Sequence, residues 1–247
     1  MALSYSLEAT IPYDMADVNS LVRVPQLMAL VMQVSGMQSI ELGMADDRIL
    51  EEYGLVWIIS DHSLKIKRLP RFLETVVIKT QPLFHNRYFC YRQFQVFDQE
   101  GNELVEMVTN FMLMDLKTRK VQSVVPEIVA AFESSFEKTI RRGPKFKEIV
   151  ASREQEFRVR FYDLDMNGHV NNAKYLEWIY ESLGSDFLRR HSPTSIYIKY
   201  NREVMADSLV NSQVELEELT SHHQIQSQGV VNAQAQIEWK VLEENGD

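Results

Sequence analysis

The sequence predicts an α+β fold built from two successive copies of one unit, a long helix followed by several antiparallel strands. Three observations support this prediction. A helix-length apolar segment is followed by strand-like segments, and this order occurs twice along the 247 residues. Turn residues separate the strand-like segments, as in antiparallel hairpins. Short sequence blocks also recur at corresponding places in the two copies, which is the mark of an internal repeat.

The first copy opens with a short strand over residues 5–11, where apolar and polar residues alternate. A buried helix is expected over 27–42, because its residues are apolar almost all round. It opens near Pro25, since proline is tolerated in a first turn. A polar connection is expected over 45–53. The strands predicted to follow are 56–66, 75–81, 88–97, 104–116 and 121–125.

The second copy repeats this order. A strand over 155–161 leads to an amphipathic helix over 173–190, in which apolar residues recur at three- and four-residue steps. Between the copies, residues 126–153 are rich in charge around Gly143 and are predicted to be a linker that is helical at first. The remaining strands are predicted at 195–200, 209–219, 224–231 and 233–241.

Residues 13–16, Tyr-Asp-Met-Ala, stand before the first helix as residues 162–165, Tyr-Asp-Leu-Asp, stand before the second. This pairing predicts that the first copy keeps the architecture and lacks the polar groups of the second. The counterparts on this pairing are Ala16 for Asp165, Val18 for Asn167, Ser20 for His169 and Pro70 for Glu203.

The overall composition narrows the class of protein. A formal net charge of −9 argues against nucleic-acid binding as the main function. The single cysteine, Cys90, excludes an internal disulfide and fits a reducing compartment. The start of the chain has neither a signal-peptide pattern nor an Arg-rich transit pattern, so a cytoplasmic location is expected. The longest apolar run of the first helix, 27–32, is too short to span a membrane.

The polar loop over residues 162–172 is the strongest functional signal. Its Asp, Asn and His residues surround Gly168, just before a helix whose first N–H groups can bind an anion or an oxyanion. The backbone N–H groups from Gly168 to Val170 are therefore candidate oxyanion donors. A carboxylate, an amide and an imidazole at such a place suit the addition of water to an activated carbonyl such as a thioester.

Other chemistries lack their motifs. The sequence holds no Gly-x-Ser-x-Gly elbow and no pair of glycines spaced for a dinucleotide or phosphate loop. No Cys and His residues have metal spacing, and the adjacent His222 and His223 are interpreted as exposed turn residues. No cofactor or metal is expected.

The string Asp-x-Asn-Gly-His-Val-Asn-Asn, leading to Tyr175 and an amphipathic helix, resembles the hot-dog-fold thioesterases. More narrowly, residues 162–178 are similar to the second half of the fatty acyl-ACP thioesterases, where ACP is the acyl carrier protein. The resemblance covers nearly the whole chain. It implies two tandem hot-dog domains, the first holding the acyl-chain pocket and the second the catalytic site. The expected boundaries are 1–130, a linker over 131–153, and 154–247.

The resemblance also implies which residues act. Asp165 would orient Asn167 or His169, and Glu203 or His169 would handle the water. Whether Asp165 acts as base, nucleophile or orienting group stays open. The residues that match the family's catalytic set are Asp165, Asn167, His169 and Glu203.

One position departs from the plant family, which has Cys after the Glu where this chain has Val204. A Cys-His-Asn triad is therefore impossible there, which leaves water as the nucleophile or an acyl-carboxylate intermediate. Cys90 lies in a predicted strand of the first copy and is interpreted as structural.

The predicted function is hydrolysis of fatty acyl-ACP to free fatty acid and carrier protein. The alternatives are an acyl-CoA thioesterase with the same site, a hot-dog dehydratase, and a non-catalytic acyl-binding module. The expected partner is the carrier protein, with no nucleic acid and no membrane, and pairing into a homodimer stays open. Candidate basic docking residues for an acidic carrier are Lys65, Lys67, Arg68, Arg71, Arg141, Arg142, Lys145 and Lys147.

Overall fold

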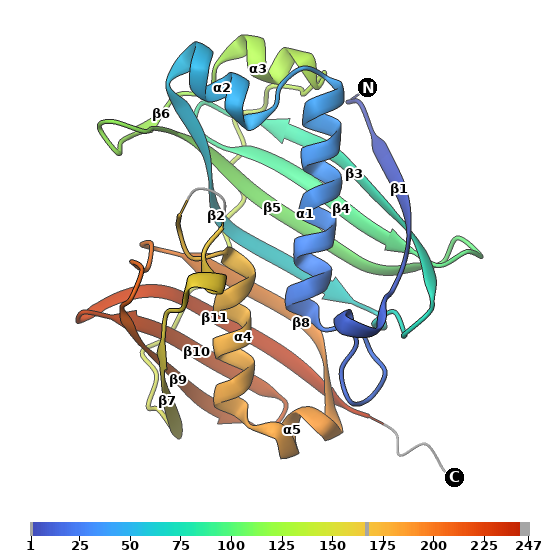
Figure 1. The fold of residues 1–247 in the computed structure, drawn as a ribbon, viewed down its shortest axis with the longest axis vertical. Helices are drawn as coiled ribbons and strands as arrows, with labels where there is room; N and C mark the ends of the chain where they lie inside the picture. Colours follow the sequence, from blue (N-terminus) through green and yellow to red (C-terminus); the bar gives the residue numbers. More distant parts are fainter. Residues whose placement is uncertain (1, 166–167, 243–247) are drawn as a thin grey trace.

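The structure is a computed structural model that describes residues 2–165 and 168–242. Figure 1 shows it as two helix-and-sheet units, one above the other. Its helices are α1 Val24–Glu41, α2 Asp46–Tyr53, α3 Pro126–Ala131, α4 Asn172–Leu183 and α5 Ser185–Arg190, with 3-10 turns η1 Tyr13–Met15 and η2 Phe161–Asp163. Its strands are β1 Tyr5–Thr10, β2 Leu55–Ile66, β3 Thr75–His85, β4 Cys90–Phe97, β5 Glu103–Asp115, β6 Val121–Gln122, β7 Arg153–Arg158, β8 His191–Tyr200, β9 Leu209–Glu217, β10 Thr220–Ser227 and β11 Val230–Val241.

Within the described residues, the strands form one antiparallel sheet in the order β1-β3-β4-β5-β2-β8-β11-β10-β9-β7, with β6 paired to β5. The two copies join where β2 pairs with β8, with Asp61 opposite Lys199 and Ser63 opposite Tyr197. The predicted α+β architecture of two copies is therefore confirmed, and main-chain hydrogen bonds make the two sheets continuous.

The helices α1 and α4 lie on the same face of this sheet, side by side (Figure 1). The α1 helix starts at Val24 with Pro25 in its first turn, and its side chains Leu27, Met28, Val31 and Val34 are buried. Buried side chains of both copies form one continuous core beneath α1 and α4. Among the described residues, no helix is long and apolar enough to cross a membrane.

The predicted polar connection over 45–53 is wrong, because residues Asp46–Tyr53 form the helix α2. Its average composition is polar, but Ile49 is buried in a smaller cluster beneath α2 and α3 with Leu113 and Ile128. A short amphipathic helix needs few apolar residues when each one meets such a cluster, so its signal in the sequence is weak.

The second long helix is shorter than predicted. It ends at Leu183, and Gly184 has φ +83°, a conformation that glycine adopts without the strain a side chain would bring. The guanidinium of Arg153 donates to the carbonyl of Leu183 at 2.6 Å and so satisfies part of the helix end. A separate short helix, α5, follows the break.

The prediction that His222 and His223 are exposed turn residues is also wrong, since both lie within β10. His223 is buried, and its Nε2 lies 2.7 Å from the hydroxyl oxygen of Ser221. Burial lowers the pKa of His223 to about 3, so its imidazole is neutral in the folded protein.

The segment between the copies is helical over α3 and then has no regular structure until β7 begins at Arg153. It crosses the face of the sheet where the copies join, and Phe146 stacks on the ring of Tyr197 with centroids 5.7 Å apart. A Cβ atom at Gly143 would overlap the Tyr197 ring, so the absence of a side chain allows the close approach.

Candidate active site

Asp165 organises the loop that precedes α4. Its N–H donates to the carbonyl of His169 at 2.7 Å, and its carbonyl accepts the N–H of Gly168 at 3.0 Å. Its carboxylate Oδ1 accepts the N–H of His169 at 3.1 Å. Gly168 has φ +76°, which favours glycine at this turn. Asn167, the remaining predicted catalytic residue of the loop, lies outside the described residues.

The expected backbone oxyanion donors are partly occupied within the loop. The N–H groups of Gly168 and His169 are both donated to Asp165, so neither is an open donor in this arrangement, and the oxyanion role of Gly168 stays a prediction. Val170 is buried and its backbone forms a bridge to Leu164. The cap of α4 is Asn171, whose side chain accepts the N–H of Ala173 at 2.9 Å.

The structure brings His169 and Glu203 together, although 34 positions separate them in the sequence. The His169 Nε2 atom lies 3.8 Å from the Glu203 Oε2 atom, and each side chain is about one-third exposed. This separation is longer than a hydrogen bond, as is common for catalytic groups before substrate binds. An imidazole and a carboxylate so placed are suited to passing a proton from water.

Arg119 is the third member of this cluster and comes from the other domain. Its guanidinium hydrogen-bonds to Glu203 Oε2 from the turn that joins β5 to β6. The carboxylate of Glu203 therefore lies between an imidazole of its own domain and a cation of the N-terminal domain. The sequence analysis did not identify Arg119 as a site residue. Its signal in the sequence is a run of basic residues at the turn between two predicted strands.

The backbone of Glu203 is fixed from two sides. The β8 strand ends at Tyr200, before Glu203. The alternation of side chains between the two faces of β8 therefore does not determine where the Glu203 side chain points. The next residue, Val204, donates its N–H to the hydroxyl of Tyr175 on α4 at 3.0 Å. The side-chain amide of Asn232 in β11 donates to the carbonyl of Glu203 at 3.1 Å. Tyr175 on α4 and Asn232 on β11, whose roles the sequence did not predict, thus position the carboxylate.

Val204 and Cys90, the two positions considered for a catalytic thiol, do not offer a nucleophile. Val204 is buried in the main core. Cys90 is the first residue of β4, and burial raises the pKa of its thiol to about 12, so it carries no thiolate near neutral pH. The structural interpretation of Cys90 fits its place in the strand.

The corresponding loop of the first copy has the same hydrogen bonds. The N–H of Asp17 donates to the carbonyl of Leu21 at 2.8 Å, and its carbonyl accepts the N–H of Ser20 at 3.0 Å. Its Oδ1 accepts the N–H of Leu21 at 3.0 Å, as Asp165 Oδ1 accepts that of His169. Ser20 has a positive φ of 59°, at the place of the glycine in the second copy.

This geometry corrects the pairing of the copies, which was one residue out of register. The first copy has kept the loop aspartate, contrary to the sequence prediction. By the same offset, Asn19 is the sequence counterpart of Asn167. The corrected pairs are Asp17 with Asp165, Ser20 with Gly168 and Leu21 with His169, in place of Ala16 with Asp165 and Ser20 with His169.

The counterpart of Glu203 also shifts by one residue. The loops after β2 and β8 each end in a turn residue with positive φ, Leu73 at 63° and Asp207 at 60°. Counting back four residues from each places Leu69, and not Pro70, opposite Glu203. The first copy therefore keeps the aspartate loop and has two leucines where the second copy has its imidazole and its carboxylate.

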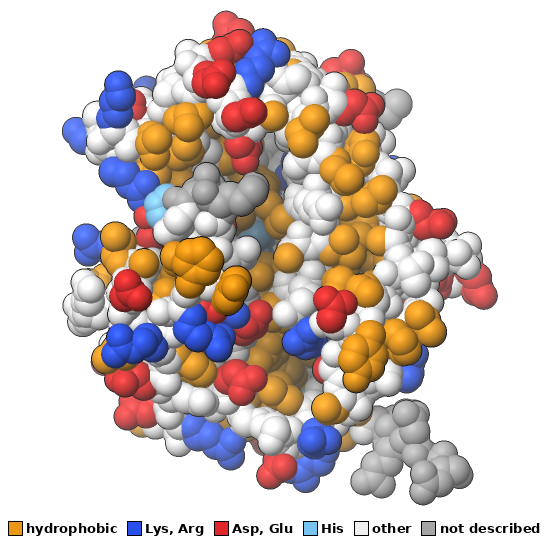
Figure 2. Space-filling view, in the orientation of Figure 1, with side chains coloured by type: hydrophobic (Ala, Val, Ile, Leu, Met, Phe, Trp, Pro, Cys, Tyr) orange, Lys and Arg blue, Asp and Glu red, His pale blue; other side chains and the backbone are white. Residues whose placement is uncertain are grey.

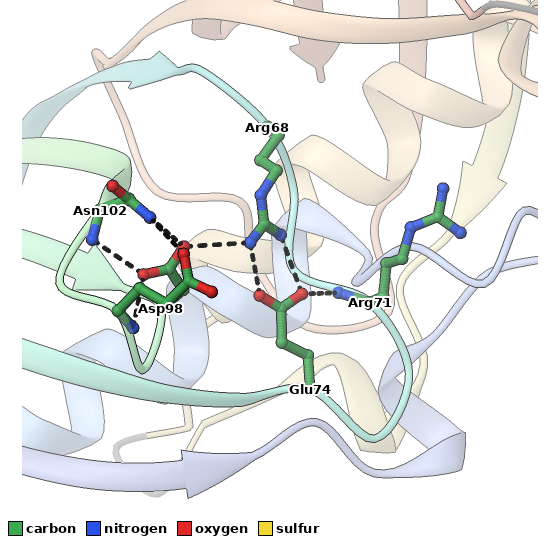
Figure 3. Close-up of polar contacts among 6 residues, drawn as sticks. Arg68, Arg71, Glu74, Asp98 and Asn102 are labelled. Carbon is green, nitrogen blue, oxygen red and sulfur yellow. Dashed lines mark hydrogen bonds and ion pairs between the residues drawn. The ribbon is translucent and has the colours of Figure 1, made fainter.

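Three of the eight basic residues predicted to dock a carrier protein, Lys67, Arg68 and Lys147, form ion pairs with acids. Figure 3 shows the guanidinium of Arg68 held by both oxygens of Glu74, at 2.9 and 2.7 Å, and lying 3.5 Å from Asp98. The ammonium of Lys147 lies 3.1 Å from Glu215. Because these charges are balanced locally, they add little net positive potential for a distant partner.

Two family models match the chain. The acyl-ACP thioesterase N-terminal domain matches residues 2–132, and the acyl-ACP thioesterase C-terminal domain matches residues 146–241. Curated relatives include an oleoyl-acyl carrier protein thioesterase of Coriandrum sativum, 24% identical over 85% of this chain and 62% of the relative. An acyl-[acyl-carrier-protein] hydrolase of Cuphea viscosissima is 29% identical over 64% of this chain. The matched region spans 40% of the Cuphea protein, and both relatives are chloroplastic.

Solved structures have the same fold. A Lactobacillus plantarum protein, whose assignment as an oleoyl thioesterase is provisional, superposes with a TM-score of 0.94 and 28% identity over 98% of both chains. The 12:0-ACP thioesterase of Umbellularia californica has a TM-score of 0.87 at 20% identity, covering 98% of this chain and 99% of that one. Since the family models cover more than half of the sequence, and two tandem hot-dog domains are observed, this chain belongs to the acyl-ACP thioesterase family.

Proposed function

We propose that this protein hydrolyses the thioester of fatty acyl-ACP to free fatty acid and carrier protein, the step that ends fatty acid synthesis. The observation that carries the proposal is the pairing of His169 with Glu203 beside the Asp165 loop, in the domain that matches the C-terminal family model. The cytoplasmic location expected from the sequence pattern stays a prediction.

In the proposed mechanism, a water molecule between His169 and Glu203 adds through its oxygen to the thioester carbonyl carbon. Its proton passes to this pair, and the tetrahedral oxyanion then breaks the C–S bond. The pantetheine thiolate leaves and takes up the proton. The engagement of Asp165 with the His169 N–H supports an orienting role for Asp165 rather than direct attack.

A carrier protein would meet a basic edge close to this site. The turn between β5 and β6 exposes Lys117, Arg119 and Lys120, and the two lysines have no ion-pair partner among the described residues. Figure 2 shows Lys and Arg side chains along the edge of the molecule that carries β6. A local positive edge would attract an acidic carrier to a chain whose net charge is −9.

The test compares hydrolysis of matched acyl-ACP and acyl-CoA substrates of one chain length. We expect a higher kcat/KM for acyl-ACP, and a loss of this preference when Lys117 and Lys120 are both changed to Glu. Equal kcat/KM for the two substrates would favour an acyl-CoA thioesterase. Tight binding of both without turnover would identify a non-catalytic acyl-binding protein.

A further inference from the structure

Asp163 is a buried carboxylate that lies two residues before Asp165 in the chain. Its Oδ2 atom accepts the N–H of Arg160 at 2.8 Å, and its Oδ1 atom lies 3.2 Å from the ammonium of Lys174 on α4. Burial raises the pKa of Asp163, but these two partners outweigh that effect and hold the pKa below its usual value. Asp163 and Lys174, whose side chains are 2% and 15% exposed, therefore form a largely buried ion pair.

This ion pair stands at the base of the loop that carries the candidate aspartate and histidine. The carbonyl of Asp163 accepts the N–H of Asn171 at 2.9 Å, and this bond joins the two ends of the loop. The side chain of Asp163 ties the same point to α4 through Lys174. The main chain and the side chain of one residue thus fix where the loop begins and ends.

The contacts continue from Lys174 to the N-terminal domain. The Lys174 ammonium also bonds to Oε2 of Glu177, within α4. The Oε1 atom of Glu177 accepts an N–H of the Gln26 side-chain amide, in α1, at 3.3 Å. A chain of side-chain contacts therefore runs from Asp163 to a helix of the other domain.

The first copy closes the same loop without an ion pair. On the corrected pairing, Met15 is the counterpart of Asp163, and Gln26 is the counterpart of Lys174. The carbonyl of Met15 accepts the N–H of Arg23 at 2.8 Å, which repeats the main-chain bond of Asp163. The side chain of Met15 packs against the main hydrophobic core. The main chain of such a loop therefore does not require the ion pair.

The two copies differ in what the loop must hold. The copy with the ion pair has an imidazole beside a carboxylate, and the copy without it has leucines at those two positions. Taking two charges out of water is unfavourable, and a buried ion pair is often no more stabilising than well-packed apolar side chains. A reacting group misplaced by about 1 Å can lose roughly 100-fold in rate, so a fixed loop base has a use in the second copy that it lacks in the first.

We propose that Asp163 and Lys174 are positioning residues of the thioesterase site. Their ion pair holds the loop with Asp165 and His169 against α4, and the contact through Glu177 holds it against α1. The N-terminal domain also supplies the guanidinium that reaches the candidate carboxylate, so the imidazole and the carboxylate are both held from that domain. The inference rests on the proposed function, because the reaction it serves is thioester hydrolysis.

The experiment gives the second copy the residues of the first, in the double variant Asp163→Met, Lys174→Gln. This variant should fold, as circular dichroism would verify, since the first copy closes its loop with the same two residues. We expect kcat for acyl-ACP to fall about tenfold or more and KM to change less than about twofold, because positioning acts on the reacting groups and not on binding. The control Arg48→Gln, Glu52→Gln removes an ion pair within α2 and should keep the wild-type kcat. A folded double variant with a kcat equal to that of the control would overturn the proposal.

A second variant tests the contact with α1 and does not touch the ion pair. Gln26→Leu should lower kcat about threefold in the wild-type background, as loss of one hydrogen bond implies. It should have no further effect in the double variant, because the chain of contacts is already broken there. Gln33→Leu is the matched control, an exposed glutamine of the same helix, and should leave kcat unchanged. Equal kcat for Gln26→Leu and Gln33→Leu would show that α1 does not position the loop.

The wild-type protein separates this inference from the proposed function. A wild type that hydrolyses no acyl thioester would contradict the proposed function itself. An active wild type beside an equally active double variant would overturn the positioning role alone. If the wild type prefers acyl-CoA, the same loss of kcat in the double variant, measured with acyl-CoA, would still support the positioning role.

Discussion

Arg119 of the N-terminal domain hydrogen-bonds to the carboxylate of Glu203 in the C-terminal domain. This contact makes the candidate active site a shared structure, although the residues predicted to be catalytic all belong to the second copy. It also gives the N-terminal domain a part in placing the carboxylate, beside any part it has in holding the acyl chain.

Changing Arg119 to Ala should lower kcat by about fivefold, because an exposed ion pair that positions a carboxylate contributes about 1 kcal/mol. Steady-state kinetics with acyl-ACP would measure this effect. Lys120→Ala is the matched control from the same turn, and its effect should be on KM alone. A kcat for Arg119→Ala equal to that of the control would show that Arg119 does not position Glu203.

The two loop aspartates offer a paired test. Asp165→Asn should lower kcat by about 100-fold or more, as expected for a group that orients an acid–base residue. Asp17→Asn, in the loop with the same hydrogen bonds, should leave kcat unchanged. Each should reduce the free energy of unfolding by about 1 kcal/mol, since both carboxylates accept backbone N–H groups. Turnover of Asp165→Asn within a few-fold of wild type would remove Asp165 from the site.

Two buried histidines predict how stability varies with pH. Burial lowers the pKa values of His62 and His223 to about 3, from 6.5 in an unfolded chain. Between these values the unfolded chain binds more protons, so stability is complete above pH 6.5 and falls as the pH drops toward 3. Each histidine contributes a slope of about 1.4 kcal/mol per pH unit in this window.

Urea unfolding at pH 7 and pH 5 would measure that slope. His223→Gln removes one titrating group that is not part of the candidate site, so the stability of this variant should depend less steeply on pH than that of the wild type. A slope unchanged by this substitution would mean that His223 is protonated or exposed in the folded protein.

Two glycines should respond in opposite directions to substitution by alanine. Gly143→Ala should cost about 1–3 kcal/mol, because the added methyl overlaps the Tyr197 ring and the linker must move away. Trypsin should then cut the linker faster at Arg141, Arg142 and Lys145. Gly36→Ala should stabilise the protein by about 1 kcal/mol, since Gly36 is exposed within α1 and its Cβ would meet nothing within 4 Å. Unchanged proteolysis of Gly143→Ala would show that the linker is not held at Tyr197.

The sequence predicted the duplicated architecture because long elements carry strong periodic signals. The α1 helix and the strand pairs of both copies are recognisable from apolar patterning alone. The short helix α2 was missed because its stability comes from Ile49 meeting Leu113 and Ile128, which lie far along the chain. The burial of His223 was missed for a related reason, since its neighbours across the sheet come from β9 and β11.

The candidate site was predictable where its residues are contiguous and not where tertiary structure assembles it. Asp165 and His169 belong to one loop, so their nearness follows from the sequence. The approach of Arg119 to Glu203 depends on the packing of two domains, which no local pattern records. The one-residue error that hid Asp17 arose because weak identity fixes register poorly, whereas matching hydrogen bonds fix it without ambiguity.

The irregular segment that crosses the joined sheets ties the two copies into one molecule, so each is always beside the other at a high effective concentration. A symmetric pair of separate chains must accept every substitution twice, once in each subunit. A tethered pair is free of that restriction. One half can accumulate leucines and lose its reactive groups while the other keeps them.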